Sequence, residues 1–227
     1  MLSSWAVPFA GVDVEAEPLA QAELRRLGVP AVPAVVVGNR VVHGWNPRGV
    51  AELLGVPYAE PARLPPAELL RRLDRILATA QDVIRRVPVE RLGATTPGRD
   101  RPVRQLAYHV FRLSLAYRDA VRERRLPKAW LDEDIPAQFA DGPAIAAYGG
   151  AVRAELSRWR VEAEEDPGLV ETHYGAQTTH ELLERTVWHA AQHVRQLCAL
   201  VEGMGIPPGG RLIPGDLEGL PLPKDLW

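Results

Sequence analysis

The sequence predicts an α+β chain in which a small α/β unit, residues 1–57, precedes an all-α four-helix bundle, residues 62–227. Three observations lead to this prediction. Short β-branched runs alternate with helical pieces before residue 58. Beyond that point the chain consists of long amphipathic segments with apolar residues at helical spacing. Between the two parts, the stretch GVPYAEPARLPP contains four prolines, which interrupt any continuous helix or strand.

Composition excludes several classes of protein. The chain has 227 residues, 46% of them hydrophobic, which is enough for one or two real cores. Its net charge is −2 and its pI about 6.3, so we expect no nucleic-acid partner. Its apolar runs are far shorter than the roughly 20 residues that cross a bilayer, and the N-terminus does not read as a signal peptide. We therefore expect a cytoplasmic protein with no membrane partner, and the single Cys198 excludes an internal disulfide.

The small unit is predicted to follow the order β, α, β, β, α. Gly38 and Asn39 separate two β-branched runs, which is a signal for a tight hairpin. Asn46, followed by proline, is a typical helix start. The five elements are expected at residues 9–15, 18–28, 33–37, 40–45 and 46–55.

This order, with GVPAVPAVVVGNRVVHGW at its centre, resembles the C-terminal part of a glutaredoxin or thioredoxin-like domain. The resemblance covers about the first quarter of the chain. In that family the proline before the third strand is cis, and the backbone of the residue before it binds the substrate peptide or thiol. The matching pair is Val32 and Pro33, so the resemblance implies that these two residues bind a thiol.

The same resemblance implies a truncated unit. The family's first strand and its Cys-x-x-Cys helix would lie upstream of Met1, and residues 1–57 contain no cysteine. Disulfide exchange requires a thiolate nucleophile. We therefore expect a redox-inactive unit that serves docking or thiol binding; the alternative is a coding sequence that starts further upstream.

The larger part is predicted to contain four helices, within residues 65–87, 101–124, 142–164 and 178–205. The fourth begins with a capping box, because Glu181 follows Thr178 by three residues. In the third, Gly149 and Gly150 mark either a weak point or a site of close packing.

Histidines on two of these helices predict a metal site. His189 and His193 are four residues apart, which places their Cβ atoms roughly 5–6 Å apart on one helix face. Both rings can then reach one ion at about 2.0–2.1 Å. His109, on the inward face of the second helix, is a third candidate ligand. Three imidazoles leave coordination positions open for water or substrate, as catalytic metal sites do.

The histidines have two alternative interpretations, a set of core residues and a zinc peptidase. A single histidine on an apolar face is more often a hydrogen-bonded core residue. Three converging imidazoles favour the metal, because burying an unpartnered ring is costly. A zinc peptidase is excluded, since HAAQH has alanine where His-Glu-x-x-His has its general base.

Residues 62–227 resemble the DinB-like superfamily, which includes bacillithiol S-transferases and mycothiol-dependent maleylpyruvate isomerases. The resemblance rests on RPVRQLAYHVFRL, on the His-x-x-x-His of the fourth helix and on the closing LPLPKDLW. It implies that His109, His189 and His193 bind a divalent metal, and zinc or nickel suits imidazole best. In characterised members the metal lowers the pKa of a low-molecular-weight thiol, and the thiolate attacks an electrophile.

The resemblance thus implies a metal-dependent thiol S-transferase or isomerase whose partners are a small-molecule thiol and an electrophile. The alternative is a non-catalytic interaction protein with a structural metal and a glutaredoxin-like docking unit. A general base would be water activated by the metal, His173 or His180. Cys198 is expected to pack in the core, because it lies about 140° around the helix from the histidine stripe. An unpaired sheet edge in the small unit predicts a homodimer or a tight dock onto the bundle.

Overall fold

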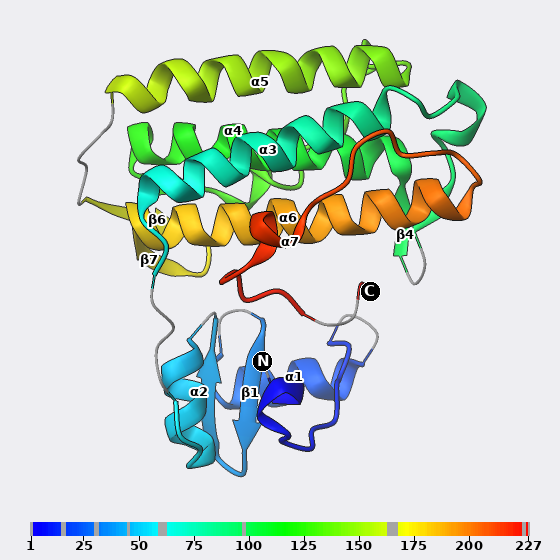
Figure 1. Ribbon diagram of the computed structural model, residues 1–227. Coiled ribbons are helices and arrows are strands. Elements are labelled where there is room, and N and C mark those ends of the chain that lie inside the picture. The colour runs from blue at the N-terminus through cyan, green and yellow to red at the C-terminus, as the bar shows by residue number, and fades with distance from the viewer. Residues whose placement is uncertain are drawn as a thin grey trace. The chain divides into compact units, whose positions relative to one another are not determined.

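The chain mixes helices with short strands and is of α+β class (Figure 1). The computed structural model describes residues 2–14, 17–29, 32–44, 46–58, 63–96, 99–162, 168–223 and 226. The chain divides into two compact units, residues 1–62 and 63–227. Part of the predicted joint, residues 59–62, lies outside the described residues.

The first unit contains one hairpin between two helices. Its elements are α1 (Pro18–Arg26), β1 (Ala34–Val37), β2 (Arg40–His43) and α2 (Pro47–Leu54), after a 3-10 turn at Leu2–Trp5. The two strands pair antiparallel around a turn in which Gly38 has a φ of 61°, a conformation that favours glycine. The Asn46 side chain accepts a hydrogen bond of 2.8 Å from the Gly49 amide, so it caps α2 as predicted.

The strand predicted at residues 9–15 is wrong. Residues 9–14 have no regular secondary structure, and residue 15 lies outside the described residues. Phe9 and Val12 are 58% and 51% exposed, so the alternation of apolar residues does not correspond to a buried face. An alternating pattern becomes a strand only where a neighbour supplies backbone pairing and a covered face. Within the described part of the first unit, β1 and β2 pair only with each other.

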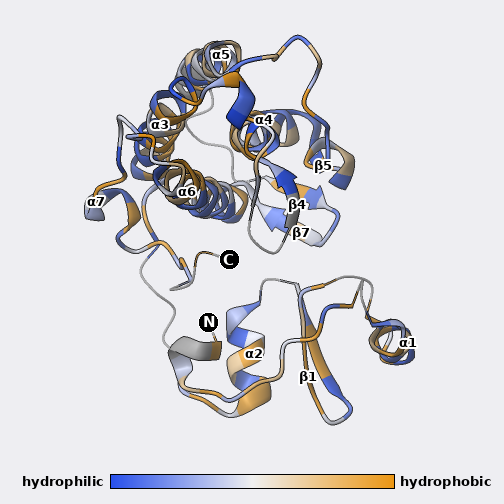
Figure 2. Ribbon diagram, turned by 90° about the vertical axis from the view of Figure 1, so that its right-hand side faces the viewer, coloured by the Kyte–Doolittle hydropathy of each residue, from blue (hydrophilic) through white to orange (hydrophobic). Residues whose placement is uncertain are grey.

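The second unit is built on four long helices that pack together. They are α3 (Pro66–Ile84), α4 (Val103–Glu123), α5 (Gly142–Glu162) and α6 (Thr179–Gly203), so all four predicted helices are present; residues 163 and 164 of the third prediction lie outside the described residues. Helices α5 and α6 each contact both α3 and α4, and Figure 2 shows the four nearly end-on around one interior. Their inward apolar side chains form a single core. No helix in the described ranges is both long and apolar enough to cross a bilayer.

Short strands join the helices, and the sequence did not predict them. A hairpin of β3 (Thr95–Thr96) and β4 (Arg99–Pro102) leads into α4. A three-stranded sheet has the order β5 (Arg125–Leu126), β6 (Leu169–Thr172) and β7 (Gly175–Thr178). Strand β5 is parallel to β6, and β6 is antiparallel to β7. The remaining elements are 3-10 turns at Val89–Arg91 and Lys128–Trp130 and the short helix α7 (Pro214–Leu217).

The capping box predicted for the fourth helix is present at the end of β7. Thr178 accepts a hydrogen bond from the Glu181 amide, and the Glu181 carboxylate accepts one of 2.9 Å from the Thr178 amide. Because Thr178 is also the last residue of β7, strand and helix meet without a loop. This junction sets the position from which α6 begins.

Gly149 is a point of close packing between α5 and α4. A Cβ atom at this position would lie 2.5 Å from ring atoms of Phe111, and one at Gly150 would lie 3.0 Å from the Gln81 amide nitrogen. Phe111 is fully buried on α4, so its ring has no room to withdraw. Of the two interpretations of this glycine pair, the structure supports close packing.

Replacing Gly149 by alanine should therefore destabilise the bundle by about 1–3 kcal/mol, the usual cost of overpacking. This cost exceeds the gain in helix propensity of about 1 kcal/mol. Gly203→Ala is the matched control, because a Cβ there meets no atom within 4 Å. Urea unfolding followed by circular dichroism measures both; equal midpoints for Gly149→Ala and the wild type would contradict the packing argument.

Candidate functional site

The three histidines singled out by the sequence come together between α4 and α6. Their candidate ligand atoms all lie within 4.8 Å of one another. The ring centre of His109 is 5.4 Å from that of His189 and 5.1 Å from that of His193. The Nε2 atoms of His189 and His193 are 2.8 Å apart. We call this group the histidine cluster.

The cluster is positioned by the apolar faces of the two helices. On α4, His109 is surrounded in sequence by the buried residues Leu106, Val110 and Leu113. On α6, His193 lies between Ala190 and Leu197, which have no exposed surface. His109 and His193 are each 7% exposed, whereas His189 is partly exposed. The packing that buries these faces therefore also holds the rings together, with His189 on the more open side.

Burial keeps His109 and His189 neutral near pH 7. It lowers the pKa of His109 to about 4, with a further contribution from the positive charge of Arg101. The pKa of His189 lies well below its usual value, first because of burial and then because of the neighbouring His193 and His109. A neutral imidazole carries one lone pair that is free to bind a cation.

Two of the rings are held from outside the cluster. The His109 ring makes a hydrogen bond to the backbone of Leu131. The Nδ1 atom of His193 lies 2.7 Å from Oε1 of Gln196, one turn further along α6. Among the described residues, His189 makes its hydrogen bond to His193. The sequence prediction missed Gln196, although its spacing of three residues from His193 is a signal for a side-chain contact on a helix.

This donor set fits a divalent cation. Two imidazole nitrogens 2.8 Å apart must share either a proton or a cation, because two bare lone pairs repel at that distance. The group contains three nitrogens and no carboxylate, a combination suited to zinc or nickel rather than to calcium or magnesium. The neutral state of His109 and His189 is the state that binds a metal.

Two arginines add positive charge near the cluster. Arg101 lowers the pKa of both His109 and His189, and Arg185 lowers that of His189. Arg185 lies four residues before His189 on α6, and its guanidinium carbon is 4.2 Å from the centre of the Tyr174 ring. It forms no ion pair within the part of the chain that the structure describes. The sequence prediction did not include either arginine; for Arg185 the four-residue spacing was the available signal.

The two histidines considered as general bases lie in different surroundings. His180 is tied to the bundle, since its Nε2 lies 2.9 Å from the Leu64 carbonyl oxygen. His173 packs edge-on against Tyr174, and its pKa is lowered first by burial and then by charges that include Arg185. His173 therefore shares a charged neighbour with His189, whereas His180 has a structural role.

The predicted thiol-binding pair, Val32 and Pro33, belongs to the first unit. The peptide bond between them is cis, the state that the resemblance implies. The Val32 side chain is 51% exposed, and the Pro33 carbonyl oxygen accepts a hydrogen bond of 2.8 Å from the Gly44 amide. The pair thus lies just before β1, and the Pro33 carbonyl oxygen is hydrogen-bonded within the hairpin.

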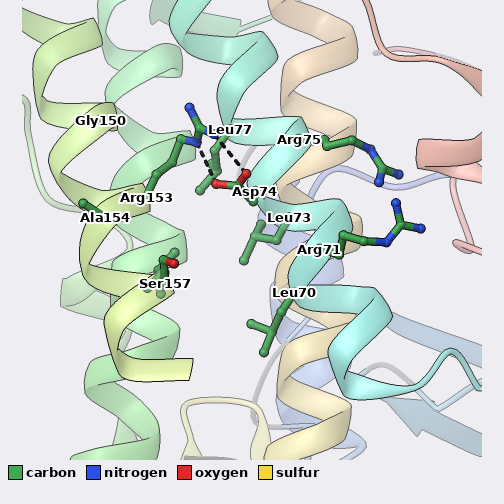
Figure 3. Close-up of a pocket in the computed structure, with 11 residues that line it drawn as sticks. Leu70, Arg71, Leu73, Asp74, Arg75, Leu77, Gly150, Arg153, Ala154 and Ser157 are labelled. Carbon is green, nitrogen blue, oxygen red and sulfur yellow. Dashed lines mark hydrogen bonds and ion pairs between the residues drawn. The ribbon is translucent and has the colours of Figure 1, made fainter. Parts of the chain in front are cut away.

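A groove of about 490 Å³ lies between α3 and α5 and contains none of the three histidines (Figure 3). Its charged residues are already paired. Arg153 on α5 makes two hydrogen bonds, of 2.8 and 2.9 Å, to the Asp74 carboxylate on α3. Arg75 pairs with Asp216, and Arg71 pairs with Glu68. The arginines of this groove are therefore engaged in ion pairs, and the histidine cluster is the stronger candidate for a functional site.

Comparison with known proteins bears on the first unit. Residues 1–42 match the family model for glutaredoxin. This match includes α1, β1 and most of β2, and it supports a glutaredoxin-like N-terminal segment. No curated protein and no solved structure matches the chain.

Cys198 should react slowly with alkylating agents in the folded protein. Burial raises the pKa of its thiol to about 11, so only about one molecule in a thousand is a thiolate near pH 8. An ordinary cysteine at that pH is roughly one-quarter thiolate. We expect iodoacetamide to modify the native protein on the order of 100-fold more slowly than the urea-unfolded protein. Equal rates in the two states, measured by mass spectrometry, would contradict this environment for Cys198.

Proposed function

We propose that the chain is a metal-dependent S-transferase or isomerase that uses a low-molecular-weight thiol, with His109, His189 and His193 as the metal ligands. The observation that carries the proposal is the convergence of three imidazoles from α4 and α6, of which His109 and His189 have lowered pKa values and are neutral near pH 7. His189 is the most exposed of the three residues, so a small molecule would approach the cluster from its side.

The arrangement of the helices supports the resemblance of residues 62–227 to the DinB-like superfamily. One histidine comes from the second helix of the bundle and two come from the fourth, as the resemblance implies. The glutaredoxin match supports a glutaredoxin-like segment before it. Residues 1–57 contain no cysteine, so the contribution proposed for these residues is recognition of the thiol at Val32 and Pro33.

The charges around the cluster favour an anionic reactant. When bound, a divalent ion would supply a Lewis-acidic centre that lowers the pKa of a thiol. The three imidazoles carry no negative charge that would cancel the charge of the ion. Arg101 and Arg185 add positive charge on the protein side. Sulfur in its thiolate form, or a carboxylate on the electrophile, would be stabilised in this field.

The reaction requires a group that accepts the thiol proton and a group that orients the electrophile. The thiol proton passes to a base, the sulfur forms a bond to the electrophilic carbon, and a leaving group departs or a double bond shifts. His173 is available as a base because burial and nearby cations keep it neutral. His180 is engaged with Leu64. Arg185 would orient an anionic electrophile beside the partly exposed His189.

The metal ligands and the lone thiol can be separated by substitution. We expect the purified wild type to bind about one zinc or nickel ion per chain. His189→Ala or His193→Ala removes one of three ligands and should weaken metal binding by more than roughly 100-fold, because a lost ligand costs more than a lost outer partner. Thiol conjugation to a generic electrophile should fall in parallel. Elemental analysis and a conjugation assay with several thiols measure both quantities.

Cys198→Ala is the matched control on the same helix. It should keep metal and turnover, with a loss of stability of about 1 kcal/mol from the small gap. A wild type that takes up no divalent ion would contradict the proposal. So would turnover that survives in both histidine variants but is abolished by Cys198→Ala. Metal that raises the melting temperature without any turnover would instead favour the non-catalytic interaction protein.

Charge at the mouth of the site can be tested with Arg185. Arg185→Ala should raise the KM for a carboxylate-bearing electrophile roughly tenfold, the usual effect of one lost charged hydrogen bond. The KM for a neutral electrophile should change little. Arg125→Ala is the control, because Arg125 pairs with Glu123 on the surface. An equal effect of Arg185→Ala on both electrophiles would show that this arginine does not recognise the anion.

A further inference from the structure

The end of the chain lies along the helix that carries His189 and His193. The Pro223 carbonyl oxygen accepts a hydrogen bond of 2.9 Å from Arg195. The Leu226 carbonyl oxygen accepts hydrogen bonds from the side-chain amides of Gln192, at 2.9 Å, and Gln196. These bonds tie the C-terminal backbone to α6 on both sides of His193 in the sequence.

The Leu226 carbonyl determines which way the Gln196 amide faces. A carbonyl oxygen can only accept, so the NH2 group of Gln196 must point toward Leu226. The amide oxygen then points toward Nδ1 of His193, 2.7 Å away. Because that oxygen can only accept, Nδ1 must carry a proton. A neutral His193 ring with a proton on Nδ1 has its lone pair on Nε2, the atom that faces His189.

We infer that Gln196, oriented by the C-terminal backbone at Leu226, is a positioning residue that fixes the Nδ1–H tautomer of His193 and so strengthens cation binding by the histidine cluster. The effect on binding rests on the proposed function; the effect on the tautomer does not. With His193 in this tautomer, the proton between the two Nε2 atoms of the metal-free protein is carried by His189. The acceptor at Nδ1–H makes Nε2 of His193 a stronger ligand and holds the ring in its orientation. Outer partners of this kind commonly contribute about 10–100-fold to metal affinity.

Gln196 differs from the other outer partner of the cluster. His109 is held through the backbone of Leu131, which a side-chain substitution does not remove. Among the described residues, His189 has no partner other than His193 for its ring nitrogens. Gln196 is thus a side chain at which the orientation of the His193 ring can be changed without altering a ligand.

The experiment compares Gln196→Ala, Gln196→Glu and Gln192→Ala with the wild type in the full-length protein. Gln196→Glu loses the donor to the Leu226 carbonyl but keeps an acceptor for Nδ1–H, because either carboxylate oxygen can accept and no orientation by Leu226 is needed. Gln192→Ala removes a bond to the same Leu226 carbonyl but leaves the Gln196 contact to His193 intact. Two quantities are measured: the tautomer of His193 in the metal-free protein by 15N-resolved NMR of the imidazole, and the Kd for zinc by competition with a chelator.

We expect the wild type to show Nδ1–H on His193. Gln196→Ala should shift His193 toward Nε2–H and weaken zinc binding about 10–100-fold. Gln196→Glu should restore the wild-type tautomer, and both it and Gln192→Ala should keep a Kd within about threefold of the wild type. Rescue by glutamate distinguishes positioning from packing, because a packing role would not require an acceptor.

Several results would overturn the inference: Nε2–H on His193 in the wild type, an unchanged zinc Kd in Gln196→Ala, or an equal loss in Gln196→Ala and Gln192→Ala. A wild type that binds no zinc would overturn the proposed function and the claimed effect on affinity. The tautomer measured in the metal-free protein would then still decide whether Gln196 orients His193.

Discussion

The packing of α4 against α6 is the constraint on which the histidine cluster depends. The apolar faces that meet there exclude water from the rings of His109 and His193. Exclusion of water makes the charged form of an imidazole costly, so burial lowers the pKa of His109 and of His189, and both rings are neutral near pH 7. Stability and chemistry therefore share the same residues: a change that loosens the helix pair also changes the basicity of the cluster.

Carboxylates are absent from the histidine cluster among the described residues. Several acidic side chains of the second unit pair with arginines, as Asp74 does with Arg153 and Glu133 does with Arg112. None belongs to the cluster of candidate ligands in the described residues. A site with nitrogen ligands and no carboxylate discriminates against hard cations without any size filter. It also leaves positive charge uncompensated, which suits an anionic reactant better than a cationic one.

The sequence predicted the parts of the structure that depend on periodicity. The four long helices, the cap at Thr178 and the inward placement of the three histidines follow from spacing along one helix. The sequence analysis missed or wrongly predicted the elements that depend on a partner far away in the sequence. Strand β5 has two residues and pairs with a segment more than 40 positions away, and residues 9–14 alternate without a strand beside them. The contact of Gln196 with Leu226 spans 30 residues of chain, and spacing alone does not fix such a path.

The junction between β7 and α6 fixes the rotation of α6 about its own axis relative to the sheet. Strand β7 ends at Thr178 and the helix starts at the next residue, so no loop can absorb a change in length between the sheet and His189. Each residue of a helix turns the chain by about 100°. One inserted or deleted residue between Thr178 and His189 would rotate both α6 histidines away from His109, although all three histidines would still be present. Natural variation in chain length should therefore be confined to other segments, and the distance in sequence from Thr178 to His189 should be as characteristic of functional relatives as the histidines themselves.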